Sequence, residues 1–471
     1  MADSISRQFA RWAANLRYED LPPAVVDKVK ALILLHLVAA TMGAEMPRAK
    51  ELIELVKREE GKPDGGTIIG DGAKATRNGA TVANCEVLHV SGLYDSYRMI
   101  THPGPVVVAV ALTNAEIEHK SLKDVIVALA AGYEFECRLA NNFVPSTSAQ
   151  GFRPAPIFST MGATMVAAKL MDLDEEGIVS AIAIGASSAS GLNEAGRVGG
   201  GEQAVHEPNA AKQGVFAATM ARTGHIKGSE TVIEGDAGFL NAYAGSRGGK
   251  LKYNFQGPMQ VDLGTITAGL GLQYEMLTVM FRMYATAGYN QPVIDLIKEM
   301  REQHRINPDE IETVTVFMNY IETLYPSPEF PRYPDPSKAY AGSTQYFAAH
   351  AAVHGGYPVV GGKRYGPESG DLDKDAKVLD FMTNHVRLVG VHDQPMFSPE
   401  VTIRMKDGAT FMGSYPYKRM EWNFDQTVAR LQECVPGVPG GQTQLDALVE
   451  LMRTAENLPS TVRILELTAA R

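Results

Sequence analysis

Apolar residues recur at helical spacing through the first half of the chain. The segment 22–42 carries Val25, Val29, Ile33 and Val38 on one side of a helix that opens at two prolines. The same spacing predicts further helices at 4–16, 47–60, 76–91, 103–118, 122–139, 157–171, 175–191 and 208–224, with a short extended piece at 66–70. Alanine and glycine are frequent in these segments, so the helices can pack with their axes close together. This pattern predicts an all-helical first domain.

The pattern changes after residue 257. Apolar and polar residues alternate at 311–317, 385–389 and 401–405, and a turn at 406–409 leads into a further strand at 410–411. Helices are predicted between these strands at 291–303 and 343–354, and the helical pattern returns at 427–434 and 442–453. The chain therefore reads as mainly α with an α+β second domain. The predicted boundaries are 1–257 for the helical domain, 258–420 for the α+β module, and 421–471 for helices that return to the first domain.

Composition and charge narrow the class of protein. The chain has 471 residues, is 45% hydrophobic and carries a net charge of -10 without a long run of Lys or Arg. Neither nucleic acid nor an anionic membrane is therefore an expected partner. The N-terminus shows no signal-peptide pattern, and the apolar windows at 31–43 and 106–115 are shorter than a membrane span. Cys85, Cys137 and Cys434 lie far apart and are expected to be buried thiols, which favours a cytoplasmic location.

The densest group of chemically versatile side chains lies in the stretch 84–105. Tyr94, Asp95, Tyr97, Arg98 and His102 fall within nine positions, between two apolar helices. A loop that carries an acid, an imidazole, a guanidinium and two phenols suits acid/base chemistry on a charged small molecule. The alternative interpretation is a solvated connection between helices. The proline-rich stretch 326–340 is too irregular for a helix or strand, and we expect a mobile loop beside the site.

Two further candidates lie close to predicted helix starts. Arg153 precedes a helix, where backbone donors and the helix dipole both favour an anion such as a carboxylate. Its alternative is an ion pair with a neighbouring Asp or Glu. His206 follows a glycine-rich loop and opens the next helix, where a single histidine often has only a structural role.

The second domain adds weaker candidates. Tyr320 follows the 311–317 strand and could offer its hydroxyl to a cleft, although buried tyrosines are more often core aromatics. Gln291 lies in a polar stretch just before a helix. The sequence contains no metal-ligand spacing, no nucleophile elbow and no dinucleotide fingerprint, so we expect neither a metal nor an organic cofactor.

The order of several motifs resembles the MmgE/PrpD family, which includes 2-methylcitrate dehydratase, cis-aconitate decarboxylase and iminodisuccinate epimerase. The matching stretches are A-N-C-E-V-L-H followed by an acid and H-P-G, G-Y-E-F-E-C-R-L, G-F-R-P with G-A-T-M-V-A-A-K-L-M-D-L, V-H-E-P-N-A-A-K-Q-G-V-F-A-A, E-G-D-A-G-F, and P-E-V-T-I-R-M-K-D-G-A. The resemblance implies a large helical domain, a smaller α+β lid and a cleft between them. It also implies a homodimer that uses no cofactor. Such a protein removes a proton from the carbon beside a carboxylate.

The site departs from the family pattern at several positions. His102 and Asp95 are kept, and Tyr320 resembles a tyrosine of the decarboxylase-like members. The departures are Gly92 and Tyr94 in place of acids, Arg153 and Gln291 in place of histidines, and Gln203 in place of a lysine. These changes remove groups that carry protons in the usual site, which argues against an ordinary 2-methylcitrate dehydratase.

The resemblance and the residues together lead to three hypotheses. The first is a cofactor-independent lyase or isomerase acting on a small carboxylic acid, with His102 as base, Asp95 orienting it, Arg153 binding a carboxylate, and Tyr320 or His206 as acid. The pocket would be shaped by Tyr94, Tyr97, Arg98, Gln203 and Gln291. The second is a conventional 2-methylcitrate dehydratase with relocated acid/base groups. The third is a dimeric carboxylate-binding protein without catalysis.

Overall fold

The first half of the chain folds into packed helices. We analysed a computed structural model that describes residues 3–255, 259–332, 339–358 and 375–468. The helices of this part are α1 (Ile5–Asn15), α2 (Pro23–Gly43), α3 (Pro47–Glu60), α4 (Arg77–His89), α5 (Pro103–Ile117), α6 (Leu122–Ala140), α7 (Val144–Ala149), α8 (Pro154–Leu170), α9 (Glu175–Ser188), α10 (Glu194–Val198), α11 (His206–Arg222) and α12 (Phe239–Ala244). A two-stranded sheet of β1 (Gly61–Thr67) and β2 (Lys74–Ala75) lies beside α4 and α5.

Small residues let the central helices approach closely, as the composition predicted. Helix α8 is buried along almost its whole length and packs against α6 and α11. A Cβ added at Gly132 of α6 would lie 2.3 Å from Val166, and one added at Gly214 of α11 would lie 2.3 Å from Ala163. Glycine is required at both crossings because any side chain would push the helices apart.

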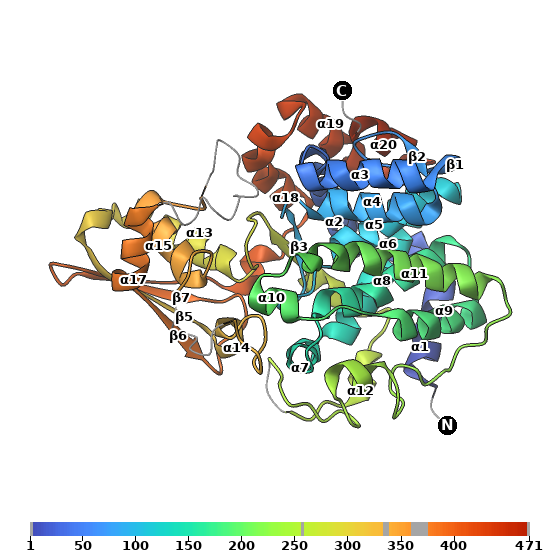
Figure 1. The fold of residues 1–471 in the computed structure, drawn as a ribbon, viewed down its shortest axis with the longest axis horizontal. Coiled ribbons are helices and arrows are strands. Elements are labelled where there is room, and N and C mark those ends of the chain that lie inside the picture. Colours follow the sequence, from blue (N-terminus) through green and yellow to red (C-terminus); the bar gives the residue numbers. More distant parts are fainter. Residues whose placement is uncertain (1–2, 256–258, 333–338, 359–374, 469–471) are drawn as a thin grey trace.

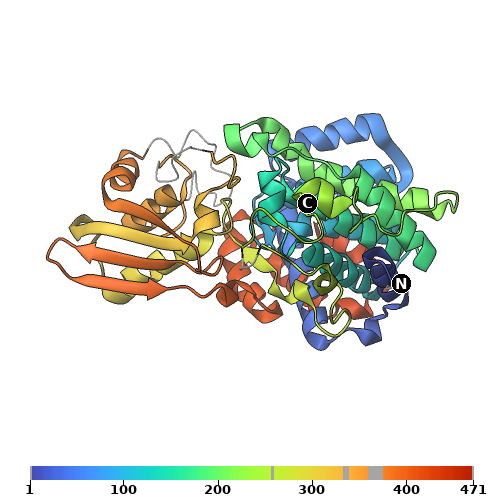
Figure 2. The same ribbon diagram turned by 90° about the horizontal axis from the view of Figure 1, so that it is seen from below.

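The second part of the chain contains a four-stranded sheet. Its strands are β5 (Ile311–Asn319), β6 (Val386–Val391), β7 (Glu400–Met405) and β8 (Thr410–Ser414), in the order β6-β5-β7-β8. Strand β5 runs parallel to β6 and antiparallel to β7. The helices here are α13 (Asn290–His304), α14 (Tyr320–Thr323), α15 (Thr344–His354) and α17 (Ala376–His385). Figures 1 and 2 show this part at one end of the molecule, beside the helical part.

The C-terminal helices return to the helical part. They are α18 (Phe424–Leu431), α19 (Gly441–Arg453) and α20 (Val462–Thr468), and the first two pack against α2 from the opposite end of the sequence (Figure 1). The predicted class, mainly α with an α+β part, is confirmed. The domain boundaries at 257 and 420 stay a prediction.

A second small sheet joins the two parts of the chain. Strand β3 (Tyr94–Ser96) pairs antiparallel with β4 (Met280–Arg282), so that Tyr94 lies opposite Arg282. The buried ammonium of Lys28 donates to the carbonyl of Val279, 2.5 Å away, and to that of Trp422, 3.3 Å away. The lysine thereby fixes the segment that enters β4. Both strands are only three residues long, which is too short for an alternation pattern to reveal them.

Several details differ from the sequence prediction. The extended piece expected at 66–70 is strand β1, which begins at Gly61, and α17 was not predicted. The expected loop at 326–340 lies partly outside the described residues, which resume at Ala339. Cys85, Cys137 and Cys434 are buried and free, as expected. Within the described ranges, no helix combines the length and apolarity that a membrane crossing requires.

Candidate active site

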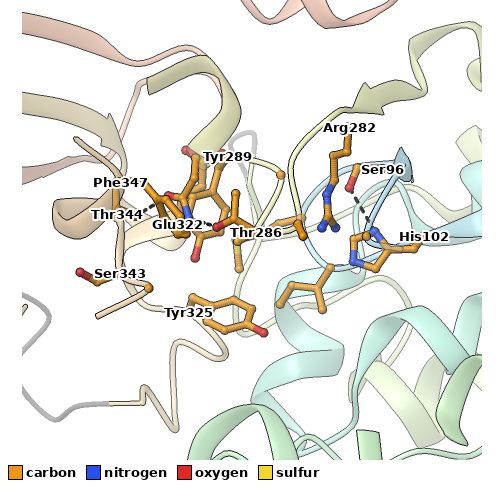
Figure 3. A pocket seen from close by; sticks show the side chains of 18 of the residues that line it. Ser96, His102, Arg282, Thr286, Tyr289, Glu322, Tyr325, Ser343, Thr344 and Phe347 are labelled. Atoms are coloured by element: carbon orange, nitrogen blue, oxygen red, sulfur yellow. Dashed lines mark hydrogen bonds between the residues drawn. The ribbon is translucent and has the colours of Figure 1, made fainter. Parts of the chain in front are cut away.

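A pocket of about 490 Å³ lies between the helical part and the sheet-bearing part. The helical part, with β4, contributes the end of α4, strand β3, the start of α5 and the residue before α8. The sheet-bearing part contributes α14, the starts of α13 and α15, and the loop that carries Phe397. Figure 3 shows the labelled side chains in two groups that face each other. We call the group of Tyr94, Ser96, His102, Arg153 and Arg282 the His102 wall. We call the group of Thr286, Tyr289, Asn290, Glu322, Thr344 and Phe347 the Glu322 wall.

The alternation of strand β3 decides which residues of the predicted loop reach the pocket. Tyr94 and Ser96 line it, whereas Asp95, between them, points to the opposite side. Arg282, which is paired with Tyr94 across the sheet, lies on the pocket side as well. Its guanidinium carbon is 4.1 Å from the centre of the Tyr94 ring, a cation–π contact. The short sheet therefore places a phenol, a hydroxyl and a guanidinium on one surface.

His102, the residue before α5, presents one ring nitrogen to the protein. Its Nδ1 lies 3.1 Å from the hydroxyl of Ser96 and 3.2 Å from the backbone carbonyl of Asp95. Because a carbonyl can only accept, Nδ1 carries the proton and Nε2 keeps its lone pair. The residue is 8% exposed and lines the pocket, with its second ring nitrogen on the pocket side (Figure 3).

The surroundings of His102 favour its neutral form. Burial lowers the pKa of its imidazole well below the ordinary value, and the charges of Arg282 and Arg153 lower it further. His89, at the end of α4, also lines the pocket, and burial lowers its pKa to about 4. Both imidazoles are therefore uncharged at neutral pH in the free protein.

Arg153 lies in the pocket wall but already has a partner. Its Nη1 is 2.5 Å from Oε1 of Glu207, and both side chains are buried. The same carboxylate oxygen is 3.9 Å from Nε2 of His89. The arginine lowers the pKa of Glu207 against the opposing effect of burial, so the pair is ionised. The alternative interpretation of Arg153, an ion pair within the protein, is thus the one observed.

Arg282 is a buried pocket cation without an ion-pair partner among the described residues. It is 4% exposed, and its Nε makes no hydrogen bond among the described residues. Within the same residues no carboxylate lies at ion-pair distance from it. Figure 3 shows its guanidinium pointing towards His102 and the pocket. A buried guanidinium in this position suits an anionic ligand, and a carboxylate matches its planar geometry.

Of the ten residues that the sequence singled out, His102, Tyr94, Arg153 and Gln203 line the pocket. Tyr97 is buried and its hydroxyl donates to Glu275, 2.7 Å away. Arg98 donates to the same carboxylate and to Asn141. These two side chains stabilise the loop from the protein side instead of shaping the pocket, which corrects the expectation for both.

Three more predicted residues, which come from α11, α13 and α14, lie outside the pocket. Gln291 accepts from the amide of Met283 and so joins α13 to the end of β4. Tyr320 opens α14 and its ring packs against His392, with centroids 4.3 Å apart. His206 is half-buried at the start of α11, where burial and Arg153 lower its pKa. None of these three is among the residues that line the cavity, so an acid role for Tyr320 or His206 has no direct support from their positions.

Asp95 acts from behind the pocket. Its carboxylate accepts from the amide of Gly104, 2.9 Å away, and from the hydroxyl of Tyr133, 2.6 Å away. Nε2 of His36 lies 4.0 Å from the same carboxylate. The expected orienting role for His102 is therefore carried by the backbone carbonyl of Asp95, while its side chain fixes the start of α5 to α6.

Sequence reasoning missed Arg282, Ser96, Glu322 and Glu207. Ser96 lay inside the stretch that was singled out, and Glu207 follows His206 directly. Arg282 and Glu322 carry no local signal, because each depends on contacts with residues far away in the sequence. No group of three His, Cys, Asp or Glu side chains in the described ranges is arranged to hold a metal ion.

Comparisons with known proteins give a consistent relationship. Residues 7–252 match the family model described as the MmgE/PrpD N-terminal domain. A cis-aconitate decarboxylase-like protein, oryM, of Aspergillus oryzae is 21% identical over 323 residues, which cover 66% of this chain and 65% of the relative. A cis-aconitate decarboxylase of Aspergillus terreus is 22% identical over 307 residues, which cover 64% of this chain and 61% of the relative. The chain therefore spans less than two thirds of the length of these curated relatives.

Proposed function

The chain belongs to the MmgE/PrpD family, and from this premise we propose that it is a lyase that moves a proton at the carbon beside a carboxylate of a small acid. One observation carries the proposal. The lone pair of Nε2 of His102 faces a cavity in which Arg282, a buried cation, has no carboxylate partner among the described residues. A base beside an anion-binding group is what removal of such a proton requires.

Arg282 supplies the binding step. A carboxylate of the substrate pairs with its guanidinium, and the hydroxyl of Ser96 and the ring of Tyr94 complete that end of the site. As the neighbouring carbon loses its proton, a second negative charge develops on the carboxylate oxygens. Arg282 stabilises that charge more strongly than the charge of the ground state, which is how such a group accelerates the step.

His102 carries the proton. Nε2 takes it from the carbon. Nδ1 keeps its own proton, which it donates in a hydrogen bond to the backbone carbonyl of Asp95. The resulting imidazolium returns the proton to a departing hydroxyl group, which leaves as water. One imidazole therefore serves as base and as acid, without a proton donor at Tyr320 or His206.

Binding of the substrate also changes the proton affinity of His102. The charges of Arg282 and Arg153 hold its pKa below the ordinary value in the free protein. An anion that binds beside Arg282 offsets this positive charge, so the pKa of His102 rises when the site is occupied. The base therefore becomes stronger when a substrate is present.

The experiment that tests the proposal measures exchange of carbon-bound hydrogen. The protein is incubated in deuterium oxide with a panel of small carboxylic acids that includes 2-methylcitrate, cis-aconitate and the monomethyl esters of short diacids, and NMR follows deuterium uptake and new products. We expect exchange or product formation on at least one acid, and loss of both in His102→Ala. Unaltered turnover in His102→Ala would rule out the assigned base.

A second candidate function is binding of carboxylates without catalysis. The Arg153–Glu207 pair favours it, because this pair removes one cation from substrate binding. In that case the acids would stabilise the protein against heat, and no acid of the panel would exchange or react. The homodimer expected from the resemblance stays a prediction that light scattering tests.

A further inference from the structure

Glu322 is a buried acid on the wall opposite His102. It lies in α14, directly after the end of strand β5, and is 1% exposed. Its Oε1 accepts a hydrogen bond of 2.8 Å from the backbone amide of Phe397. Its Oε2 is buried, makes no hydrogen bond among the described residues, and belongs to a side chain that lines the pocket. A native structure leaves few buried polar atoms unpaired, and one beside a cavity indicates a ligand group.

Three polar neighbours of Glu322 on this wall are engaged with one another. The hydroxyl of Thr344 donates to the amide oxygen of Asn290, and the amide nitrogen of Asn290 donates to the hydroxyl of Thr286, both at 2.8 Å. The rest of the wall includes the apolar side chains of Phe347, Leu388 and Phe397. The carboxyl group of Glu322 therefore has an open hydrogen-bonding position that these three residues do not fill.

No cation compensates this carboxyl group within the described residues. The pKa of Glu322 is raised to about 8, because burial raises it by more than the backbone amides of Phe397 and Asn319 lower it. The titratable group that faces it from the residue before α13 is Tyr289, whose own pKa is raised well above 10 by burial. Other charged or titratable residues around the site, on neighbouring loops and strands, are Tyr325, Arg332, Tyr340, Arg282 and, beyond Tyr320, His392. At neutral pH Glu322 is therefore a hydrogen-bond donor towards the cavity.

We propose that Glu322 is a specificity-determining residue that selects an uncharged hydrogen-bond acceptor, such as an ester, ketone or amide carbonyl, at the end of the substrate remote from Arg282. The substrate class is then a monocarboxylic acid with a polar, uncharged far end. This inference rests on the proposed function, because Arg282 must hold the carboxylate of the same molecule.

The reason is the difference in charge between the two walls. A carboxylate at the His102 wall meets Arg282, whereas a second carboxylate at the Glu322 wall would lose its water without gaining a cation. An uncharged carbonyl there accepts the proton of Glu322 and loses little on leaving water. A site built in this way distinguishes a diacid from its half-ester by leaving the wrong ligand unpaired.

The test uses matched pairs of ligands: malonate, succinate and glutarate, each with its monomethyl ester. Calorimetry at pH 6.5 and at pH 9.5 gives the affinity of each ligand for the wild type, for Glu322→Gln and for Glu322→Leu. An ester carbonyl can accept and cannot donate, so it reports on the proton of Glu322 alone. The three chain lengths allow for the unknown separation that the substrate spans.

For the best-fitting length we expect the half-ester to bind the wild type about tenfold more tightly than the diacid at pH 6.5. This preference should fall by a similar factor at pH 9.5, where Glu322 is ionised. Glu322→Gln still donates from its amide, so it should keep the preference at both pH values. Glu322→Leu should lose it at both. Other titrating groups, including Lys28 with its pKa of about 7, are shared by all three proteins.

Three results would overturn the inference: tighter binding of the diacids at both pH values, an unchanged pH dependence in Glu322→Gln, or no binding of either class. Failure of the lyase proposal looks different. Exchange of deuterium on diacids regardless of residue 322 would leave the lyase standing and remove the selectivity. Selective binding of half-esters without exchange on any ligand would keep the selectivity and remove the lyase proposal.

Discussion

The two walls of the pocket differ in how far the protein itself satisfies their buried polar groups. On the His102 wall, the imidazole is held by Ser96 and the carbonyl of Asp95, and Arg153 is paired with Glu207. On the Glu322 wall, a buried carboxyl group has one oxygen bound and one free of hydrogen bonds within the described residues. The first wall is fixed in charge and geometry, whereas the second is left for a ligand to complete.

This contrast separates chemistry from recognition. A group that moves a proton must be held to within a fraction of an ångström, which Ser96 and the Asp95 carbonyl do for His102. A group that recognises a substrate gains specificity from being unpaired in the free protein, because only the right ligand satisfies it. Arg282 shares this second property although it lies on the first wall. Mutations of the groups that move protons should therefore impair turnover, and mutations of the groups that recognise the ligand should impair binding.

The largest effect is expected at His102. Replacing it by alanine removes the group that carries the proton, and we expect the rate to fall by about 10²–10⁴-fold once the substrate is known. Carboxylate binding should persist, because Arg282 is untouched. Turnover and calorimetry on the same preparation check both expectations. His225→Gln, at an exposed position after α11, is the matched control. Equal losses of binding and turnover in His102→Ala would place His102 in recognition.

The two buried arginines offer the next comparison. Arg153→Gln leaves Glu207 buried without its cation, so we expect the free energy of unfolding to fall by about 3–5 kcal/mol. The double variant Arg153→Gln/Glu207→Gln should recover part of this loss. Arg282→Gln leaves no buried anion unpaired, so it should change stability little and weaken carboxylate binding by roughly 10- to 100-fold.

Urea unfolding and calorimetry on the same set of variants separate the two arginines. The division of roles would be wrong if Arg153→Gln were as stable as the wild type, or if Arg282→Gln bound carboxylates normally. In the first case the ion pair with Glu207 contributes nothing measurable. In the second, another cation of the pocket holds the substrate.

A smaller effect is expected behind the His102 wall. Tyr133→Phe removes the hydroxyl that donates to Asp95 and leaves that oxygen buried with one partner fewer. We expect a loss of about 1–3 kcal/mol in the free energy of unfolding, with binding of carboxylates unchanged because Tyr133 does not line the pocket. Tyr18→Phe, in the 3-10 turn Tyr18–Asp20, is the control and should stay within about 0.5 kcal/mol. Weaker binding in Tyr133→Phe alone would mean that Asp95 reaches the ligand.

The sequence predicted the His102 wall better than the Glu322 wall for a physical reason. His102, Tyr94 and Arg153 lie beside helix starts and breakers that leave a local pattern. Even there the prediction failed for Asp95. The stretch was treated as an irregular loop, and the alternation of the three-residue strand β3, which turns Asp95 away from the pocket, was not recognised.

The Glu322 wall and Arg282 could not be found in this way. Arg282 reaches the pocket because β4 pairs with a strand nearly two hundred positions earlier, and Glu322 is buried because the segment around Phe397 folds over it. Burial of a charged residue is a tertiary property, and a glutamate in a short amphipathic stretch is usually exposed. The helices and most strands, by contrast, follow local periodicity, which is why the fold class was predicted correctly.

The pH dependence of turnover offers the finest test of the contrast. The neutral form of His102 is the base, so on the acidic side kcat/KM should fall when the pH drops below the pKa of His102 in the free protein, which lies well below 6.5. Part of this depression comes from the charge of Arg282. In Arg282→Lys the charge remains and the acidic limb should stay in place, whereas in Arg282→Gln it should move to higher pH by up to about one unit. A limb that does not move in Arg282→Gln would mean that burial alone sets the proton affinity of His102. The two walls would then differ in hydrogen bonding and not in charge.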